Sequence, residues 1–519
     1  MTTTGGGASG RSEESVKRLT LIACILATGL TTLDSTIVNV ALPTIQRDLG
    51  GGLAAQQWVV NAYLVTLGSL ILIGGSLGDV FGPRRVFAIG VGGFGAASVL
   101  CAAAPSDDFL VVARAVQGMA GALLMPSALA VIMTTFPPPE IGGAIGSWAA
   151  WSASSALIGP LAGGGLLEIT SWRWIFLVNV PLVALTLALV LMAVPRAPGR
   201  GPDARRVDVP GAVMAALGLG AVVFALIEQP RQGWDDPGVL IPLIAGAVLL
   251  VAFLLYESRA KDPMLPLGLF RRRNFAAGNV ETLAVYGGLA LLFFFLVLLL
   301  QQVEGYSAIE SGLALMPITL VIIALSRRAG ALAGRFGPRV FMGTGPLLCA
   351  LGLLLLQRVE QPIDYWAQVF PAVIVFAIGM ATTVAPLTTA VLVGAGPQTG
   401  IASGVNNAIA RLAGLVAIAA LGAVVAASFS SELDDRVAKA SLGPAAMAEA
   451  ENTKRLPLGL PNVEGLPSGE ARALTEAAED ASFESFHLAM LIAAALAALG
   501  GIAGFAGIRN PPPVPPPSP

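Results

Sequence analysis

The chain has 519 residues, of which 55% are hydrophobic and 12% are charged, with a formal net charge of −2. Soluble domains carry about 25% charged residues, so this composition excludes a soluble globular protein. It indicates a membrane protein with many spans, whose mean hydropathy is +0.78.

Apolar runs long enough to cross a bilayer, which takes about 20 residues, recur along the chain. They predict an all-α polytopic membrane protein with fourteen transmembrane helices. The predicted spans are 19–42, 56–77, 85–104, 109–134, 142–167, 174–194, 209–229, 238–256, 274–301, 310–326, 340–357, 366–392, 401–427 and 486–508.

The basic residues of the short loops predict the orientation. With the N-terminus in the cytoplasm, the inner segments carry 19 Lys and Arg, and the short outer segments carry four. Basic loops stay on the cytoplasmic side, so both termini are predicted to be cytoplasmic. The rule excludes long loops such as 428–485. That segment is acidic and contains four prolines, and we expect short surface helices there on the outer face.

Asp34 lies inside the first predicted span, where an ionised carboxylate costs roughly 2.5–3.5 kcal/mol and by default marks an ion or substrate path. Arg114, in the fourth span, lies at a similar depth from the outer side, since the two depths are roughly 8 and 12 Å. We therefore predict that Arg114 approaches Asp34 in one protonation state. Its movement would switch Asp34 between binding and releasing a proton. The alternative is a buried polar group that only orders the helix.

Glu281 in the ninth span and Arg411 in the thirteenth form a second candidate pair. Two interpretations stay open. The pair is either a structural ion pair, or Glu281 is a second proton site or a site for cationic substrates. Polar residues predicted to line a substrate cavity are Asn39, Gln117, Asn279, Tyr286, Asn406, Asn407 and Arg411.

Two similar inner loops follow the second and tenth spans, at 75–85 and 330–339. Such repeats are typical of secondary transporters, whose site lies between two halves. In the first loop an Asp and two Arg can form charge-assisted hydrogen bonds with the other half or with helix ends, which would close an inner gate. The alternative is a solvated turn. The candidate gating residues of this loop are Gly75, Asp79, Gly82, Arg84 and Arg85.

The fifth predicted span is rich in small residues and contains a proline. Small residues let helices approach closely in lipid, and the proline removes one helix hydrogen bond and favours a bend. The pattern predicts a surface where two halves pack and rock, and ordinary helix packing is the alternative. Its residues are Gly146, Ser155, Gly159, Pro160, Gly163 and Gly164.

These motifs resemble those of the major facilitator superfamily, and in particular its fourteen-spanner drug:proton antiporter family of the QacA/EmrB type. The stretch 33–43 is similar to that family's first-helix motif, and 114–121 to the superfamily's fourth-helix motif. The loop 75–85 is similar to the inner-loop motif, with Val80 where an Arg is common. The fifth span resembles the antiporter motif, with Ser155 in place of one Gly. The resemblance implies a major facilitator fold and export rather than import.

The predicted organisation has two six-helix bundles and two inserted helices. Its parts are a cytoplasmic tail at 1–18, an N-terminal bundle at 19–194, a linker with the inserted helices at 195–273, a C-terminal bundle at 274–508 containing the outer loop 428–485, and a proline-rich cytoplasmic tail at 509–519.

The sequence thus predicts a proton-coupled antiporter that exports amphipathic or cationic small molecules by alternating access. We expect a plasma-membrane protein that acts as a monomer, with the lipid bilayer, protons and a small-molecule substrate as its partners and no nucleic acid. The sequence contains no Walker-type loop, so we expect no ATP, and we expect no metal, cofactor or catalytic site. One alternative is a dedicated exporter of one endogenous metabolite, antibiotic or lipid. Another is a non-transporting sensor or scaffold.

Overall fold

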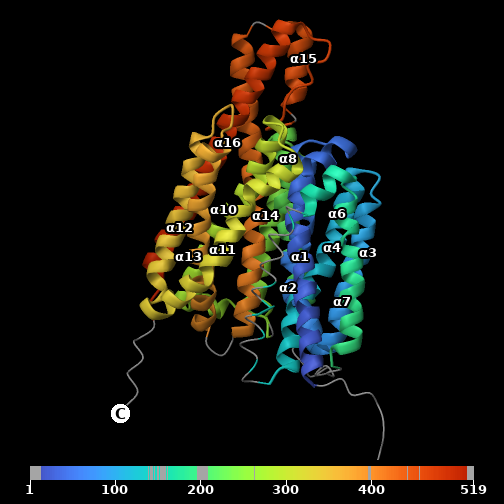
Figure 1. Cartoon of the computed structure of the whole chain (residues 1–519), viewed down its shortest axis with the longest axis vertical. Helices are drawn as coiled ribbons and strands as arrows, with labels where there is room; N and C mark the ends of the chain where they lie inside the picture. The colour runs from blue at the N-terminus through green and yellow to red at the C-terminus, as the bar shows by residue number, and fades with distance from the viewer. Residues whose placement is uncertain are drawn as a thin grey trace, which may run out of the picture.

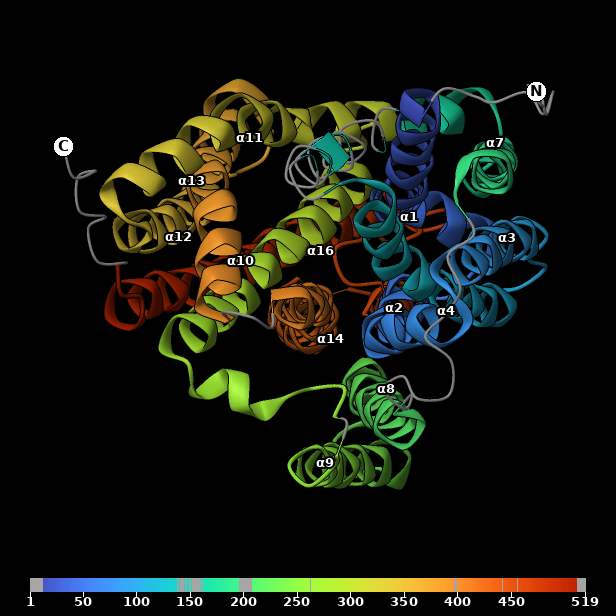
Figure 2. The ribbon, with the colours of Figure 1, turned by 90° about the horizontal axis from the view of Figure 1, so that it is seen from below.

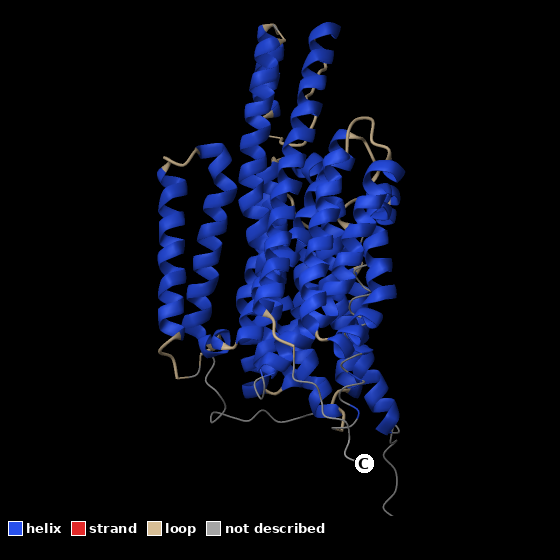
Figure 3. Cartoon of the chain, turned by 90° about the vertical axis from the view of Figure 1, so that its left-hand side faces the viewer, coloured by secondary structure: helices blue, strands red, loops and turns tan. Residues whose placement is uncertain are grey.

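The secondary structure is helical throughout the part of the chain that the computed structural model describes (Figure 3). The described residues are 13–137, 140, 144, 147, 148, 151, 159, 162–195, 208–261, 263–395, 399–440, 442–454 and 456–510.

The N-terminal helices are α1 (Glu13–Leu49), α2 (Leu53–Phe81), α3 (Pro83–Ala102), α4 (Asp107–Thr135), the single turn α6 (Trp174–Leu177) and α7 (Asn179–Ala193). Two helices follow, α8 (Val209–Gln232) and α9 (Pro237–Glu257). The C-terminal helices are η1 (Leu267–Arg271), α10 (Arg273–Leu298), η2 (Leu299–Val303), α11 (Ala308–Phe336), α12 (Pro338–Leu355), η3 (Leu356–Arg358), η4 (Tyr365–Val369), α13 (Phe370–Ala395), α14 (Thr399–Lys439), α15 (Pro444–Thr453) and α16 (Ser468–Gly507).

Twelve of the described helices are long and apolar enough to cross a membrane. In addition, α2 occupies the predicted span at 56–77, and most of the predicted span at 142–167 lies outside the described residues. The structure therefore confirms the all-α membrane fold, while the total of fourteen spans remains a prediction.

The two helix groups are arranged side by side (Figure 2). The helices α1 to α7 form one group, α10 to α16 form the other, and α2 packs against α14 where the groups meet. The inserted pair lies outside both groups, with α8 packed on α9, α2 and α14. This arrangement confirms two bundles with an inserted helix pair.

The repeated Gly-Pro loops have the same backbone form in both groups. Gly82, between α2 and α3, and Gly337, between α11 and α12, have φ values of 90° and 87°. This left-handed conformation favours glycine. The proline that follows each glycine starts the next helix, where its missing N–H costs nothing.

Both described ends of the chain lie at the face opposite α15 (Figure 1). We call this the terminal face, and the opposite one the α15 face. On the α15 face, α14 and α16 project well beyond the other helices. The prediction of short surface helices at 428–485 was wrong for most of that segment, because α14 runs on to Lys439 and α16 begins at Ser468. A small apolar core holds the projection together: Phe429, Leu433, Val437, Ala450, Leu474, Ala477, Ala478 and Ala481.

Glutamine side chains connect the two groups toward the α15 face. Gln301 Nε2 donates to Val40 O (3.1 Å), and Gln302 Nε2 donates to Gln46 Oε1 (3.0 Å). Both donors lie in η2, a π-helical turn that ends α10. Gln57 Nε2, from α2, donates to Ile418 O of α14 (3.0 Å). We call these bonds the glutamine contacts.

Candidate functional site

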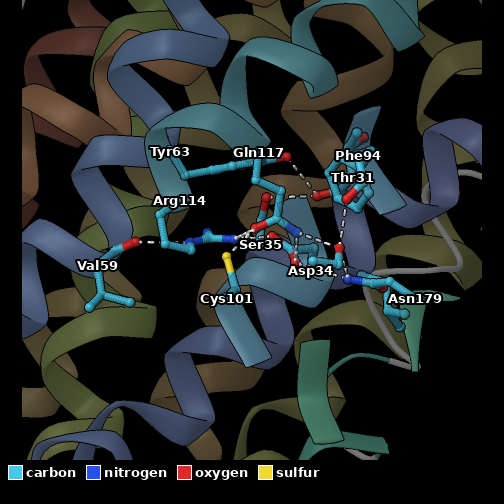
Figure 4. Close-up of polar contacts among 12 residues, drawn as sticks. Thr31, Asp34, Ser35, Val59, Tyr63, Phe94, Cys101, Arg114, Gln117 and Asn179 are labelled. Atoms are coloured by element: carbon cyan, nitrogen blue, oxygen red, sulfur yellow. Dashed lines mark hydrogen bonds and ion pairs between the residues drawn. The ribbon is translucent and has the colours of Figure 1, made fainter. Parts of the chain in front are cut away.

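Asp34 and Arg114 lie in contact inside the N-terminal group (Figure 4). Arg114 Nη1 of α4 lies 2.5 Å from Asp34 Oδ2 of α1, and the two side chains are 1% and 0% exposed. The predicted approach of Arg114 to Asp34 is therefore confirmed. A fully buried ion pair needs its remaining hydrogen-bonding groups satisfied, because desolvation of the charges is costly.

Neighbouring side chains and a backbone carbonyl form hydrogen bonds with the remaining polar atoms of the ion pair. Gln117 Nε2, one turn after Arg114, donates to Asp34 Oδ1 (2.8 Å), and its Oε1 accepts from Arg114 Nη1 (2.6 Å). Arg114 Nε donates to Val59 O of α2 (3.0 Å). The Tyr63 ring lies 4.3 Å from the Arg114 guanidinium carbon, which is cation–π geometry.

Sequence reasoning missed Asn179, which bonds to Asp34, and Ser98, which accepts from Asn179 and Gln117. Asn179, at the start of α7, donates from Nδ2 to Asp34 Oδ1 (3.2 Å) and to Ser98 Oγ (3.3 Å) of α3. Both side chains are fully buried. The available signal was their occurrence as polar residues inside apolar spans, where such groups need partners. The side chains of α4 and α7 thus bond to the carboxylate on α1, and Ser98 of α3 extends this buried network through Gln117 and Asn179.

Glu281 and Arg411 do not pair. Both Glu281 carboxylate oxygens lack a hydrogen-bond partner among the described residues, and the side chain is fully buried. It lies against α16, since a Cβ placed on Gly504 would be 2.9 Å from Glu281 Oε2. Arg411 lies instead against α2, 3.8 Å from a Cβ placed on Gly68. The structural ion pair, one of the two interpretations left open, is therefore not formed, because the two side chains leave their helices in different directions.

A polar cluster links α10 with α14. Asn406 Nδ2 donates to Asn279 Oδ1 (3.1 Å) and to Thr282 Oγ1 (2.7 Å). Asn39, on α1, is partly buried and donates to Ser35 O (3.1 Å). The structure therefore joins Asn279 and Asn406. The remaining predicted lining residues, Tyr286 and Asn407, are partly buried.

The first inner loop contacts its own half. Arg84 Nη2 donates to Leu191 O (2.5 Å), in the last turn of α7, so of the two expected kinds of partner this residue bonds to a helix end and not to the other half. Gly75, Gly82 and Arg85 lie at the terminal-face ends of α2 and α3. Asp79 lies in α2, and its side chain is outside the described part.

Three glycines of the fifth predicted span lie at helix contacts. A Cβ on Gly159 would meet Thr36, and one on Gly163 would meet Ile37, both in α1. A Cβ on Gly164 would lie 2.7 Å from the backbone nitrogen of Ile309, at the start of α11 in the other group. The remaining residues of this motif, Gly146, Ser155 and Pro160, lie outside the described residues.

The described residues include no group of three His, Cys, Asp or Glu side chains placed as metal ligands. Two bundles of membrane-spanning helices, one of which contains a fully buried ion pair, define the class of the protein: a polytopic membrane transporter.

Comparisons with known proteins agree with this class. Residues 24–441 match the family model of the Major Facilitator Superfamily. The puromycin resistance protein of Streptomyces alboniger is 39% identical, over 80% of this chain and 83% of that protein. The tetracenomycin C resistance and export protein of Streptomyces glaucescens is 34% identical, over 92% and 89%. The multidrug resistance protein Stp of Mycobacterium tuberculosis (strain CDC 1551 / Oshkosh) is 35% identical, over 82% and 79%.

Among solved structures, an inward-facing bacterial homologue of the human lysosomal transporter Spinster superposes with a TM-score of 0.63. The superposition covers 97% of this chain and 100% of the other chain. At 17% identity it shows a shared fold and nothing more. The chain belongs to the major facilitator superfamily. It is a multi-pass membrane transporter and not an enzyme, while its place in the fourteen-spanner subfamily remains a prediction.

Proposed function

We propose that this protein is a proton-coupled antiporter that exports amphipathic small molecules by alternating access. It would act as a monomer in the plasma membrane, with the terminal face in the cytoplasm. We also propose the domain bounds that the sequence predicts. The proposal is supported by the names of the relatives, which refer to antibiotic and multidrug resistance and to export.

The observation that carries the proposal is the Asp34–Arg114 pair. Asp34 is buried among four helices, so its charge must be neutralised either by Arg114 or by a proton. A proton on Asp34 would release Arg114 from the pair, and α4 would then be free to change its position relative to α1. Proton binding and helix movement are coupled in this way.

Glu281 is proposed as a second proton site. Because its carboxylate oxygens have no partner and are fully buried, the neutral acid is the form that this environment favours. A conformational change that brings water or a cation to α10 would let the proton leave.

The contacts between the groups support alternating access. The glutamine contacts and the packing of Gly164 on Ile309 close the groups toward the α15 face. In the proposed orientation this is the outer side. Breaking these contacts would open the path for release of the cargo.

The driving force is sufficient for export. One proton that enters down a potential of 100 mV supplies roughly 2.3 kcal/mol. That free energy supports about fortyfold accumulation of a neutral molecule.

The test is efflux from proteoliposomes with an imposed pH gradient, using the purified wild type, Asp34→Asn and Glu281→Gln. We expect wild-type efflux to stop when a protonophore is added, and Asp34→Asn to lose gradient-driven efflux while it still exchanges cargo without a gradient. Asp108→Asn, which changes an exposed acid of α4, is the control and should behave as the wild type. Gradient-driven efflux that survives in Asp34→Asn would refute the role of Asp34.

A second candidate is a dedicated exporter of one antibiotic or other endogenous metabolite. The names of two relatives favour it, since each refers to a single compound: puromycin and tetracenomycin C. A panel of chemically unrelated dyes separates the two. Transport of several dyes supports the multidrug exporter, and transport of none, with activity on one antibiotic, supports the dedicated one.

A further inference from the structure

We call the contact between α2 and α14 the α2–α14 seam. The residues that form it share one face of each helix. Residues 57, 61 and 68 of α2 fall within about 40° of one another around the helix, at 100° per residue. Residues 411, 418 and 422 of α14 do the same. Contacts at both ends confirm that these faces meet: Gln57 bonds to Ile418 O, and Gly68 packs against Arg411 and Leu412.

Arg411 is the cation of this seam. It is partly buried, and within the described residues its guanidinium makes no hydrogen bond or ion pair. Its Cβ lies 3.8 Å from a Cβ placed on Gly68 of α2, so Arg411 is at the contact between the two halves. A cation that is partly removed from water and has no counter-ion is unfavourable, so an anion that reaches Arg411 would be stabilised there.

The other intramembrane charges cannot supply that anion in this state. Asp34 is neutralised by Arg114 inside the N-terminal group. Glu281 is turned toward Gly504 of α16, away from the seam. Among these four charges, the one presented to the seam is positive.

A second group at the seam also lacks a partner. Asn61 is fully buried, and neither its Nδ2 nor its Oδ1 has a hydrogen-bond partner among the described residues. It lies on the seam face of α2, about two turns from Gly68 toward the α15 face. Buried amides are normally bonded, so both polar atoms of Asn61 remain available to a ligand that reaches the seam in another state.

We infer that Arg411 binds an ionised acidic group of the transported molecule, such as a carboxylate or an acidic phenol, and that Asn61 bonds to a polar group of the same molecule. This inference rests on the proposed export function and gives it a substrate class. The cargo is amphipathic and anionic. Cationic cargo, the alternative expected from the sequence, would meet a like charge at the seam.

The experiment uses two probes of similar size and opposite charge, fluorescein and rhodamine 123, in the proteoliposome assay. The variants are Arg411→Gln, Arg411→Lys and Asn61→Leu, with Arg259→Gln at an exposed site as the matched control. We expect Arg411→Gln to lower fluorescein efflux at least about tenfold, as for a lost charge-assisted hydrogen bond, while Arg411→Lys keeps part of it. Rhodamine 123 efflux should be unchanged or higher in Arg411→Gln.

The outcomes separate the two proposals. If the wild type moves neither probe nor any other compound under a pH gradient, the export function fails. If the wild type moves rhodamine 123 and Arg411→Gln lowers both probes equally, export stands and the anion site is refuted. Binding of fluorescein to the detergent-purified wild type is a second test, and its result does not depend on whether a variant folds. Weaker binding of fluorescein than of rhodamine 123 would also refute the anion site.

Discussion

Arg114 of α4 holds Asp34 of α1 in an ion pair with a distance of 2.5 Å between Nη1 and Oδ2, and neither side chain is more than 1% exposed. The pair joins two helices that are far apart in the sequence. Each partner neutralises a charge that the surrounding helices cannot solvate, so the loss of one has a different consequence from the loss of both.

Arg114→Met is expected to destabilise the protein by roughly 3–5 kcal/mol, because it leaves the Asp34 carboxylate buried without its counter-ion. The double variant Asp34→Asn with Arg114→Met should recover most of this loss while remaining inactive in gradient-driven efflux. Thermal unfolding in detergent, measured for both single variants and the double variant, checks the prediction. Additive losses in the double variant would contradict the pairing as the source of the effect.

Asn179→Leu removes one donor from Asp34 Oδ1 and leaves the ion pair in place. A hydrogen bond to a charged group contributes about 1.5–3 kcal/mol, so the variant should be destabilised by about that free energy. Thermal unfolding in detergent measures this. Asn452→Leu, at an exposed position of α15, serves as the control and should leave the melting temperature unchanged.

Replacing Gln57 and Gln301 by Leu removes two of the glutamine contacts. Each contact contributes about 1 kcal/mol, so the pair of substitutions should shift the equilibrium by more than tenfold toward the state that is open at the α15 face. Spin labels on Asp108→Cys and Glu360→Cys, both exposed, report this opening as a longer distance by double electron–electron resonance. An unchanged distance distribution would show that other contacts hold the α15 face closed.

Gly164→Ala and Gly165→Ala form a matched pair. A Cβ on Gly164 would lie 2.7 Å from Ile309 N and 2.9 Å from Ile309 Cβ, whereas a Cβ on Gly165 would meet nothing within 4 Å. We expect Gly164→Ala to hinder closure of the α15 face and to slow efflux about tenfold, and Gly165→Ala to behave as the wild type. The same spin-label distance and the efflux rate check both variants. Equal behaviour of the two would mean that this contact does not limit the cycle.

The carboxyl groups of Asp208 and Glu257 face each other where α8 and α9 meet at the terminal face. Asp208 Oδ1 accepts from Gly211 N, and Glu257 Oε2 accepts from Leu265 N, each at 2.9 Å. Their other oxygens, Oδ2 and Oε1, lack a donor among the described residues, and the two residues are 7% and 2% exposed. A proton between the two carboxyl groups is needed for them to bond.

Glu257→Gln supplies a permanent N–H donor to Asp208. We expect it to raise the melting temperature in detergent by a few degrees at pH 8, where the wild type tends to lose the shared proton. The gain should shrink at pH 5, where the wild type keeps that proton. Unfolding measured at both pH values checks the sign. A gain of equal size at the two pH values would exclude a shared proton.

Much of the candidate site follows from depth in the membrane, and depth is encoded in the sequence. The apolar spans fix where each residue lies along its helix, because the hydrocarbon core must be crossed by about 20 residues. Depth alone placed Asp34 and Arg114 at compatible levels. The repeated Gly-Pro loops also predicted the division into two halves. In the structure, the turns at Gly82 and Gly337 have the same backbone conformation.

Depth alone did not decide whether Glu281 and Arg411 form an ion pair, because a contact also requires that the two side chains face each other. Asn406 of α14 faces α10, and Arg411, five residues later, points about 140° away from it, toward α2. The prediction of an ion pair did not take this rotation into account.

The sequence by itself determined the membrane class, the helices, the level of each charge and the small residues that let helices approach. The tertiary structure alone decided which face of each helix meets which neighbour. It brought Asn179 and Ser98 to Asp34, turned Glu281 toward α16, and left Arg411 at the seam. Hydrophobic spans in lipid specify depth strongly, since every polar group carries a cost there. They specify rotation weakly, because lipid and neighbouring helices are similarly apolar and packing among small residues decides the orientation.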